Sequence, residues 1–283
     1  MTNHMVFLVT GSSGYIGNCF CEYLCSKNVF FIGVDLVSGK HTSIICDLTN
    51  YTDLDNLLGE NYDFIVDFAA EPRLAMQSLE SYRQNWEIPK NLHRKFGNSK
   101  DVTYIFISSM LVSYNPSKNS SEYFYLKSKL LAENFIINET KWNCKLIIRP
   151  ASVWGENSKI YRSFFLLMKY KLFLNIPMLS GKRYLIYDLN LVHMVYELAL
   201  KDKFGGLYFG YDSLVSYAQI SKRFSRISLE FNFLFKIVLS IIGVLIKFGF
   251  FLQLYKRLLN LQKDLDLDLT GVIVYNEFTT KKI

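Results

Sequence analysis

The first half of the chain alternates short apolar runs with longer stretches of helical periodicity. The apolar runs have the length of buried strands, and they are Val6–Thr10, Val29–Asp35, Ser43–Cys46, Asp63–Phe68, Val102–Ser108 and Cys144–Arg149. The helical stretches between them are Tyr15–Lys27, Thr52–Leu58, Leu74–Phe96 and Tyr125–Asn138. Strands and helices that alternate in this way form βαβ units, whose right-handed crossovers put helices on both faces of a parallel sheet. The pattern therefore predicts an α/β fold with a doubly wound parallel sheet.

The pattern changes after Pro150. Residues 160–173 have helical periodicity, and a strand followed by a helix is predicted within 184–200. From about Leu214 onward the chain is mostly helical in composition and contains no proline. We therefore expect a first domain over residues 1–155, with its sheet completed by about 183–212. A smaller, mainly helical C-terminal domain would be built from 156–182 and 213–283, and we expect it to bind the substrate.

The chain becomes glycine-rich where the first predicted strand ends. Gly11, Gly14 and Gly17 have the spacing G-x-x-G-x-x-G, between that strand and the first predicted helix. A chain that turns sharply here, admits a pyrophosphate to its backbone and packs helix against strand excludes side chains at such positions. The helix N-terminus then offers N–H groups and positive dipole charge to the phosphates. The pattern indicates a dinucleotide-binding turn, and the alternative is a tight turn that is merely glycine-rich.

An acidic residue ends the second predicted strand, at Asp35 in 31-FIGVDL-36. An acid about twenty residues beyond such glycines can bind the ribose hydroxyls of adenosine, and it would repel a 2′-phosphate. Asp35 therefore favours NAD over NADP. The alternative is an aspartate that only caps a strand end.

Two Tyr-x-x-x-Lys pairs overlap in 121-SEYFYLKSKLLAENFI-136, Tyr123 with Lys127 and Tyr125 with Lys129. Either spacing puts both members on one helix face. A phenol is a poor base at neutral pH, but a neighbouring ammonium and an oxidised nicotinamide favour the phenolate. The tyrosine can then move a proton while a hydride moves to or from the cofactor. Periodicity does not separate the two pairs, and such pairs are also common on solvated helix surfaces.

Together these motifs resemble the extended short-chain dehydrogenase/reductase family, also called the NAD-dependent epimerase/dehydratase family. The TGxxGxxG of the family is matched by residues 10–17, and its Y-x-x-S-K-x-x-x-E by residues 125–133. Its R-P-x-x-V-Y-G is matched by residues 149–155, with Trp154 in place of the usual tyrosine. The resemblance covers about residues 5–210. It implies a Rossmann-type first domain that binds NAD.

The resemblance also implies roles for single residues. The residues that would contact the cofactor are Gly11, Ser13, Gly14, Tyr15, Ile16, Gly17, Asp35, Asp47, Leu48, Phe68, Ala69, Ala70, Asn85 and Lys129. Among the two overlapping pairs it selects Tyr125 and Lys129 as catalytic. Ser109, at the end of the fifth predicted strand, would be the third catalytic residue, and it would bind the substrate together with Tyr125. Ser108 stands next to Ser109, and the alternative is that this serine pair only forms a turn at the strand end.

Several positions depart from the family pattern or discriminate within it. The 4,6-dehydratases of the family carry an Asp-Glu pair directly after the hydroxyl residue, where this chain has Met110 and Leu111. These side chains transfer no protons, so water elimination is not expected. The triplet 71-EPR-73 after the alanine pair would reshape the sugar pocket. Arg183 resembles the family arginine that binds the nucleotide diphosphate, and a solvated basic turn is its alternative.

The expected function is that of an NAD-dependent nucleotide-sugar epimerase, most similar to the UDP-glucose 4-epimerase group. The enzyme would oxidise one sugar carbon transiently, at C4, in the synthesis of surface polysaccharide sugars. The substrate would be a nucleotide-diphosphate sugar. An NADH-dependent ketoreductase of a keto-sugar nucleotide is the nearest alternative, and a non-catalytic NAD-binding protein is another.

Composition adds limits to this expectation. The 283 residues are 50% hydrophobic and carry a net charge of +7, which suits an anionic ligand, but no dense Lys/Arg block favours nucleic acid. The five cysteines have no metal-ligand spacing, so we expect reduced thiols and no metal site. We find no signal peptide pattern at the N-terminus and expect a cytoplasmic protein, which in this family is commonly a homodimer.

One apolar segment, 234-LFKIVLSIIGVLIKFGFFLQL-254, approaches the length of a membrane-spanning helix. Lys236 and Lys247 interrupt it, and a charge within a span is costly. We therefore expect no span. The segment would pack in the core or at a dimer interface, with peripheral membrane docking as the alternative.

Overall fold

The computed structural model describes residues 5–57, 61–73, 78–99, 101–114, 122–155, 158, 170, 180–201, 205–224, 237 and 273–275. The chain divides into two compact units. The first comprises Met1–Val153, Ile186–Tyr211 and Leu267–Lys281, and the second comprises Trp154–Leu185, Asp212–Asp266 and Lys282–Ile283.

The first unit is built on an eight-stranded sheet in the order β11-β9-β6-β5-β4-β1-β2-β3, in which every neighbouring pair is parallel. Its strands are β1 (Val6–Thr10), β2 (Phe30–Asp35), β3 (Ile44–Ile45), β4 (Phe64–Asp67), β5 (Thr103–Ile107), β6 (Cys144–Pro150), β9 (Gly206–Gly210) and β11 (Ile273–Tyr275). This arrangement confirms the predicted doubly wound α/β fold. The order runs outward from β1 in both directions, and in such sheets ligands bind beyond the carboxyl ends of the strands near this point.

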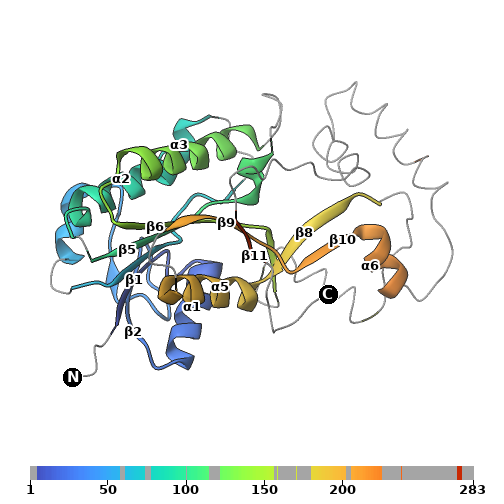
Figure 1. Ribbon diagram of the computed structural model, residues 1–283, viewed down its shortest axis with the longest axis horizontal. Helices are drawn as coiled ribbons and strands as arrows, with labels where there is room; N and C mark the ends of the chain where they lie inside the picture. Colours follow the sequence, from blue (N-terminus) through green and yellow to red (C-terminus); the bar gives the residue numbers. More distant parts are fainter. Residues whose placement is uncertain are drawn as a thin grey trace. The chain divides into compact units, whose positions relative to one another are not determined.

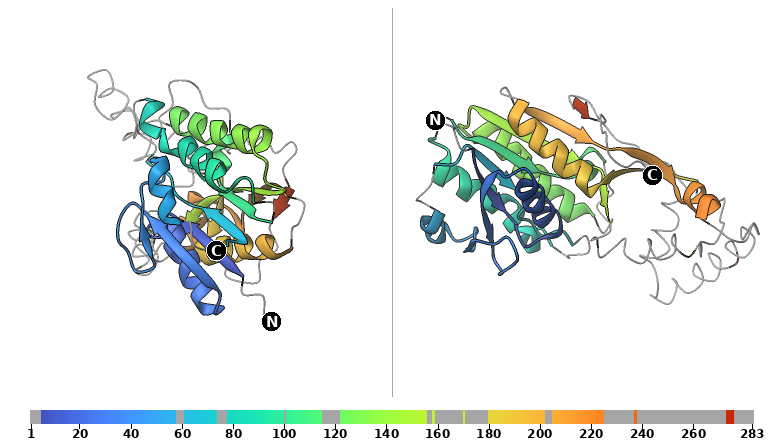
Figure 2. Two further views of the ribbon diagram at one scale, coloured as in Figure 1. Left: turned by 90° about the vertical axis from the view of Figure 1, so that its left-hand side faces the viewer. Right: turned by 90° about the horizontal axis from the view of Figure 1, so that it is seen from below.

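Helices cover both faces of this sheet (Figure 1). They are α1 (Tyr15–Ser26), α2 (Gln84–Phe96), α3 (Tyr123–Glu139) and α5 (Asp188–Lys201). Helices α2 and α3 pack together on one face, and α1 and α5 pack together on the other (Figure 2). Since both faces are covered, the central strands are buried and have almost continuous apolar sequences, such as VFLVT in β1 and TYIFI in β5.

Some elements differ from the predicted ranges. The predicted helix 52–58 is a 3₁₀ helix, η1 (Tyr51–Leu57), and the stretch before α2 contains a separate short turn, η2 (Glu80–Tyr82). A third 3₁₀ helix, η3 (Met110–Ser113), follows β5. Strand β9 lies within the stretch 183–212 that was expected to complete the sheet, although its bounds were not predicted. Strand β11 was not predicted, because a short strand at the edge of a sheet depends on pairing with a neighbour rather than on local pattern.

The second unit contains most of a three-stranded sheet with the order β10-β8-β7. Its strands are β7 (Ser152–Trp154), β8 (Lys182–Tyr187) and β10 (Ser213–Ser216), and helix α6 (Tyr217–Phe224) follows β10. The apolar segment 234–254 lies outside the described residues, apart from Ile237. Within the described part of the chain, no helix is long and apolar enough to cross a membrane.

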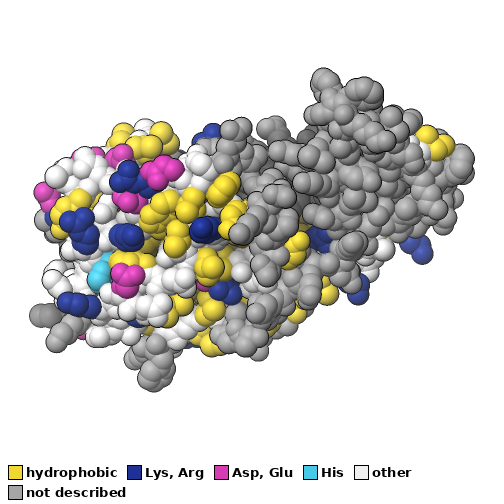
Figure 3. Space-filling model, turned by 90° about the horizontal axis from the view of Figure 1, so that it is seen from above, with side chains coloured by type: hydrophobic (Ala, Val, Ile, Leu, Met, Phe, Trp, Pro, Cys, Tyr) yellow, Lys and Arg dark blue, Asp and Glu magenta, His cyan; other side chains and the backbone are white. Residues whose placement is uncertain are grey.

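The outward face of α3 carries several apolar side chains. Leu130, Leu131 and Ile137 are 43%, 39% and 51% exposed. Figure 3 views the molecule from this side, where hydrophobic side chains lie among charged ones. Such a face suits packing against another helix, and the expected homodimer stays a prediction.

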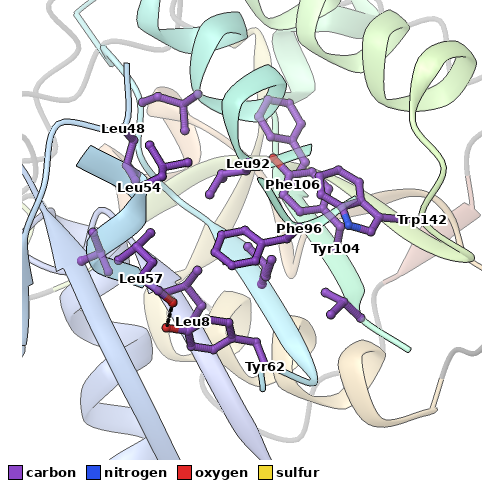
Figure 4. Packing of buried hydrophobic residues seen from close by; sticks show 14 of the residues in the cluster. Leu8, Leu48, Leu54, Leu57, Tyr62, Leu92, Phe96, Tyr104, Phe106 and Trp142 are labelled. Carbon is purple, nitrogen blue, oxygen red and sulfur yellow. Dashed lines mark hydrogen bonds between the residues drawn. The ribbon is translucent and has the colours of Figure 1, made fainter. Parts of the chain in front are cut away.

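An apolar core lies between the sheet and the helices α2 and η1 (Figure 4). The ring of Tyr104 on β5 stacks on Trp142 with centroids 4.0 Å apart, and the ring of Tyr62 meets Phe96 edge-on at 5.7 Å. The Tyr62 hydroxyl donates a hydrogen bond of 3.0 Å to the carbonyl oxygen of Leu57. This core packs α2 against the sheet and includes side chains of β4 and β5. It therefore supports the segments that follow these two strands.

Candidate active site

The glycine turn joins β1 to α1 and is tightly enclosed. Gly11 has φ +68°, and a Cβ on it would lie 2.9 Å from the backbone nitrogen of Ala69. A Cβ on Gly17 would collide with the carbonyl oxygen of Gly11. Gly14 is the N-cap of α1, and no described side chain caps that helix end. The N–H groups of the first turn therefore point toward the space beyond β1, as an anion site requires.

A cavity of about 480 Å³ opens beside this turn. It is lined by Gly11, Ser13, Gly14, Asp35, Leu36, Val37, Cys46, Asp47, Leu48, Thr49, Phe68, Ala69, Ala70, Pro72, Gln84 and Ile88. Nine of the expected cofactor contacts are among these residues, namely Gly11, Ser13, Gly14, Asp35, Asp47, Leu48, Phe68, Ala69 and Ala70. Its glycine cradle, its acid and its small side chains fit a dinucleotide. The other five, Tyr15, Ile16, Gly17, Asn85 and Lys129, are not part of the lining of this cavity.

Asp35 and Asp47 shape the walls of the cavity through hydrogen bonds. Asp35 accepts bonds from the backbone N–H of Ser13 at 2.9 Å and of Val37 at 3.2 Å, so it connects the glycine turn to the loop after β2. Asp47 accepts two bonds from Thr49, one from the backbone N–H at 2.9 Å and one from the hydroxyl at 2.7 Å. Each carboxylate oxygen retains acceptor capacity for a ligand hydroxyl.

Asn91 on α2 was missed by the sequence reasoning. Its amide nitrogen donates to the carbonyl oxygens of Leu48 at 3.0 Å and Thr49 at 2.9 Å, and its side chain is buried. It thereby fixes the loop after β3 that lines the cavity. A polar residue on the buried face of a predicted helix is the signal that would have found it.

Tyr15 turns its side chain away from the cavity. Its hydroxyl donates a hydrogen bond of 2.8 Å to Asp188 on α5. Burial and this carboxylate raise the pKa of Tyr15 far above its ordinary value. A contact of Tyr15 with a cofactor would therefore come from its backbone.

Ser109, Tyr125 and Lys129 meet at the end of β5. Ser109 is the N-cap of η3, where its hydroxyl accepts a bond of 3.3 Å from the N–H of Leu111, and its side chain lowers the pKa of Tyr125. Lys129 is 3% exposed and donates a bond of 2.9 Å to the carbonyl oxygen of Ile107. Its ammonium lies 4.8 Å from the ring centroid of Phe106. The two pairs left open by periodicity thus differ in the structure, since Ser109 lowers the pKa of Tyr125 and Lys129 is buried whereas Lys127 is exposed.

Burial controls the protonation of this group. It raises the pKa of Tyr125 to about 12, against the lowering effect of the Ser109 hydrogen bond. It also lowers the pKa of Lys129 to about 8, against the carboxylates of Asp67 and Glu133, which raise it. The pKa of Tyr125 in the protein alone is therefore shifted in the direction opposite to that expected from a neighbouring ammonium, because burial is the largest effect on it.

A buried carboxylate lies beneath the site. Asp67, at the end of β4, accepts hydrogen bonds from the hydroxyl of Thr10 at 2.6 Å and from that of Tyr104 at 2.7 Å. The Thr10 oxygen in turn accepts a bond of 3.2 Å from the N–H of Ala69. Burial raises the pKa of Asp67, and these donors together with Lys129 lower it. The network ties the end of β1 to the segment after β4.

Asn85 supports the segment after β4, residues 68–73, which we call the cofactor-lining segment. Its amide oxygen accepts from the N–H of Glu71 at 2.7 Å, and its amide nitrogen donates to the Ser128 hydroxyl at 2.9 Å. It therefore connects this segment to α3.

Arg183 lies on β8, in the part of that strand that belongs to the second unit. Its guanidinium donates a bond of 2.7 Å to the carbonyl oxygen of Lys182. Trp154 also belongs to the second unit and is buried. Within the described residues, no group of His, Cys, Asp or Glu side chains could hold a metal ion.

Comparison with known proteins places the chain in a family. A sequence model of the NAD dependent epimerase/dehydratase family matches residues 7–184. No match was found among curated protein sequences.

Solved structures support the same fold. An ADP-L-glycero-D-manno-heptose-6-epimerase from Helicobacter pylori is 20% identical, with a TM-score of 0.63 over 77% of this chain and 79% of that one. A UDP-N-acetylglucosamine 4-epimerase from Bacillus cereus is also 20% identical, with a TM-score of 0.63 over 78% and 82%. A dTDP-glucose 4,6-dehydratase from Bacillus anthracis, in complex with NAD, is 16% identical, with a TM-score of 0.61 over 78% and 80%.

The family model spans more than half of the chain and names the cofactor that Asp35 and the glycine turn predict. NAD is therefore the cofactor, and the resemblance seen in the sequence motifs is confirmed. The chain belongs to the NAD dependent epimerase/dehydratase family.

Proposed function

We propose that the chain is a nucleotide-sugar epimerase that oxidises one carbon of its substrate transiently, at C4. The observation that carries this proposal is the effect of the Ser109 side chain on the phenol of Tyr125, whose pKa it lowers, on the helix that also carries the buried Lys129. This group can move one proton at a sugar hydroxyl. The neighbouring positions Met110 and Leu111 supply no second acid or base, so reversible redox at one carbon is favoured over elimination of water.

The cofactor would be held by the glycine turn and the cavity beside it. The backbone of residues 11–17 would face the pyrophosphate, Asp35 the ribose hydroxyls of adenosine, and Asp47 and Leu48 the adenine. The small side chains of Ala69 and Ala70 would let the backbone approach the dinucleotide. Asn85 would support this contact from behind.

The proton transfer follows from the protonation of Tyr125. Its phenolate would take the proton of the sugar hydroxyl and later return it, while Ser109 orients the hydroxyl oxygen by a hydrogen bond. A bound NAD would supply the hydride acceptor and donor for the sugar carbon. Because burial raises the pKa of Tyr125 to about 12, the positive charges of Lys129 and of the oxidised nicotinamide have to lower it again during the reaction. Lys129 would also hold the cofactor ribose.

The substrate would be a nucleotide-diphosphate sugar. A guanidinium pairs bidentately with phosphate, which suits Arg183 for the diphosphate, and residues 156–182 and 213–283 would supply the rest of the pocket. The net charge of +7 agrees with an anionic substrate. We propose that the enzyme works in the cytoplasm, as a homodimer, and that its product feeds surface polysaccharide synthesis.

Nuclear magnetic resonance of the purified protein with a panel of nucleotide sugars, and with no added cofactor, tests this function. Equilibration of one sugar with its epimer is the expected result, because an epimerase keeps its NAD and returns the hydride that it takes. A change that occurs only with a keto-sugar nucleotide and NADH would identify a ketoreductase and contradict the proposal.

A further inference from the structure

The ring of Tyr82 packs against the ring of Tyr125. Tyr82 ends η2, its side chain is fully buried, and its ring meets that of Tyr125 edge-on with centroids 5.9 Å apart. Its hydroxyl donates a hydrogen bond to the carbonyl oxygen of Arg73. Tyr82 thus contacts Tyr125 through its ring and the cofactor-lining segment through its hydroxyl.

The end of that segment is held in one conformation by its own side chains. The carboxylate of Glu71 accepts bonds from Arg73, at 3.0 Å from the backbone N–H, 2.7 Å from Nε and 2.6 Å from Nη2. Glu71 is 7% exposed, and a charge-assisted, bidentate pair of this kind fixes geometry as well as charge. The carbonyl oxygen that Tyr82 contacts is therefore part of a rigid turn.

A second connection runs from the same turn to the backbone of Tyr125. The N–H of Glu71 donates to Asn85, Asn85 donates to the Ser128 hydroxyl, and Ser128 donates a bond of 2.6 Å to the carbonyl oxygen of Tyr125. Together with Tyr82, these contacts form a closed ring. Tyr125 is held by its backbone on one side and by its aromatic ring on the other.

We propose that Tyr82 is a positioning residue that couples the cofactor-lining segment to the orientation of the Tyr125 side chain. Because Ala69, Ala70 and Pro72 line the cofactor cavity, a dinucleotide bound there rests on the segment whose end Tyr82 holds. The ring of Tyr82 then limits the directions that the phenol can take toward a sugar hydroxyl, and misplacement of a reacting group is costly. This inference rests on the role of Tyr125 in the proposed function.

The electrostatic setting agrees with this role. Burial is the largest cause of the raised pKa of Tyr125, and the Tyr82 hydroxyl adds to it, whereas Ser109 lowers it. Removing the Tyr82 ring would reduce the burial of the phenol, so it would shift the ionisation of Tyr125 to lower pH as well as loosen its side chain.

Three variants test the proposal. Tyr82→Leu removes the ring, and Tyr82→Phe removes only the hydrogen bond to Arg73. Tyr62→Phe is the matched control, because Tyr62 is also buried and donates to a backbone carbonyl, that of Leu57, within the apolar core. The readouts are kcat, KM, the pH dependence of kcat, and the fluorine resonance of fluorotyrosine at position 125 as the NAD-loaded protein is titrated.

We expect Tyr82→Leu to lower kcat at least about tenfold while KM changes less than about threefold, since positioning acts on the transition state. The acid limb of its pH profile and the fluorine titration should both move to lower pH. Tyr82→Phe should lower kcat about threefold, and Tyr62→Phe should lower thermal stability with kcat and both titrations unchanged.

The proposal is overturned if the Tyr82 variants alter kcat and the fluorine titration no more than Tyr62→Phe does. Should Tyr82→Leu not fold, the comparison of Tyr82→Phe with Tyr62→Phe decides the question. A wild-type protein that interconverts no nucleotide sugar would contradict the proposed function instead. The fluorine titration needs no turnover, so it still tests the position of Tyr125 in that case.

Discussion

The guanidinium of Arg149 donates to both carboxylate oxygens of Glu133, at 3.0 Å from Nε and 2.6 Å from Nη2. Arg149 lies on β6 and Glu133 on α3, and their side chains are only 11% and 1% exposed. The same carboxylate accepts from Ser108, and Arg149 also donates to Ser113 at 3.0 Å. The pair therefore joins α3, β6 and the strand end that carries Ser109. The family motifs of residues 125–133 and 149–155, which are separate in the sequence, are therefore joined by this ion pair.

Glu133→Ala should destabilise the protein strongly. Removal of the carboxylate leaves the Arg149 charge buried and unpaired, which costs about 3–5 kcal/mol in the free energy of unfolding. Urea denaturation measures this cost. The matched control is Glu87→Ala, since Glu87 forms a pair of 3.2 Å with the exposed Arg83, and its loss should cost less than about 1 kcal/mol. Similar losses in both variants would refute the structural role of the buried pair.

Tyr125→Phe should abolish turnover and leave NAD binding nearly intact. The substitution removes the proton carrier but retains the ring, so kcat should fall at least about a thousandfold. Tyr123→Phe is the control on the same helix and should keep near wild-type kcat. If the Tyr123 variant loses activity instead, the catalytic pair is Tyr123 and Lys127, two residues earlier in the helix than assigned here.

Asp35→Ala should weaken NAD binding at least about tenfold, because a ribose hydroxyl loses a charged hydrogen-bond partner. Calorimetry on protein stripped of cofactor measures the affinity. Asp53 on η1 accepts a hydrogen bond from Asn50 and lies outside the cavity lining, so Asp53→Ala should bind NAD as the wild type does. An unchanged affinity in the Asp35 variant would remove its assigned role.

Lys129→Met should stabilise the cofactor-free protein near neutral pH. Burial lowers the pKa of Lys129 from 10.5 to about 8, so the folded state binds its proton more weakly than the unfolded state does. The cost is fully present below about pH 8 and disappears as the pH rises toward 10.5. At 1.36 kcal/mol per pH unit it amounts to about 3 kcal/mol, from which loss of the bond to Ile107 subtracts about 1–2.

Urea denaturation of Lys129→Met and wild type at about pH 7 and about pH 10 checks this sign. The advantage of the variant should be clear at the lower pH and smaller at the higher. Lys127→Met, at an exposed position of the same helix, should show no such dependence. A variant that is less stable than wild type at both pH values would show that burial of Lys129 carries no cost.

The glycine turn shows what local sequence can decide. Gly11 has a positive φ, and both Gly11 and Gly17 lie where a Cβ would meet backbone, so the residue type itself reports the conformation. The apolar run before the turn and the acid that ends β2 could likewise be interpreted without a structure. These features depend on residues close in sequence and on strand alternation, and they suffice for the fold and the cofactor.

The choice between the two Tyr-Lys pairs shows what local sequence leaves open. Both pairs have the same helical spacing, so periodicity does not separate them, and the sequence favours Tyr125 and Lys129 only through the family resemblance. The side chain of Ser109, which follows β5, lowers the pKa of Tyr125, and the ring of Tyr125 meets Tyr82 from the stretch before α2. The buried carboxylate of Asp67 was not predicted either, because its partners Thr10 and Tyr104 come from other strands.

The sequence by itself therefore determined the alternation of strands and helices, the glycine turn, the family and, through the family, NAD as the cofactor. Only the tertiary structure decided which tyrosine meets Ser109, which polar groups support the site from beneath, and in which direction the pKa values of Tyr125 and Lys129 move. The physical reason is that spacing and residue type are properties of neighbours in the chain. Burial and hydrogen bonding join residues that are far apart in the chain, and burial moves the pKa of Tyr125 in the direction opposite to that which the Tyr-Lys spacing alone suggests.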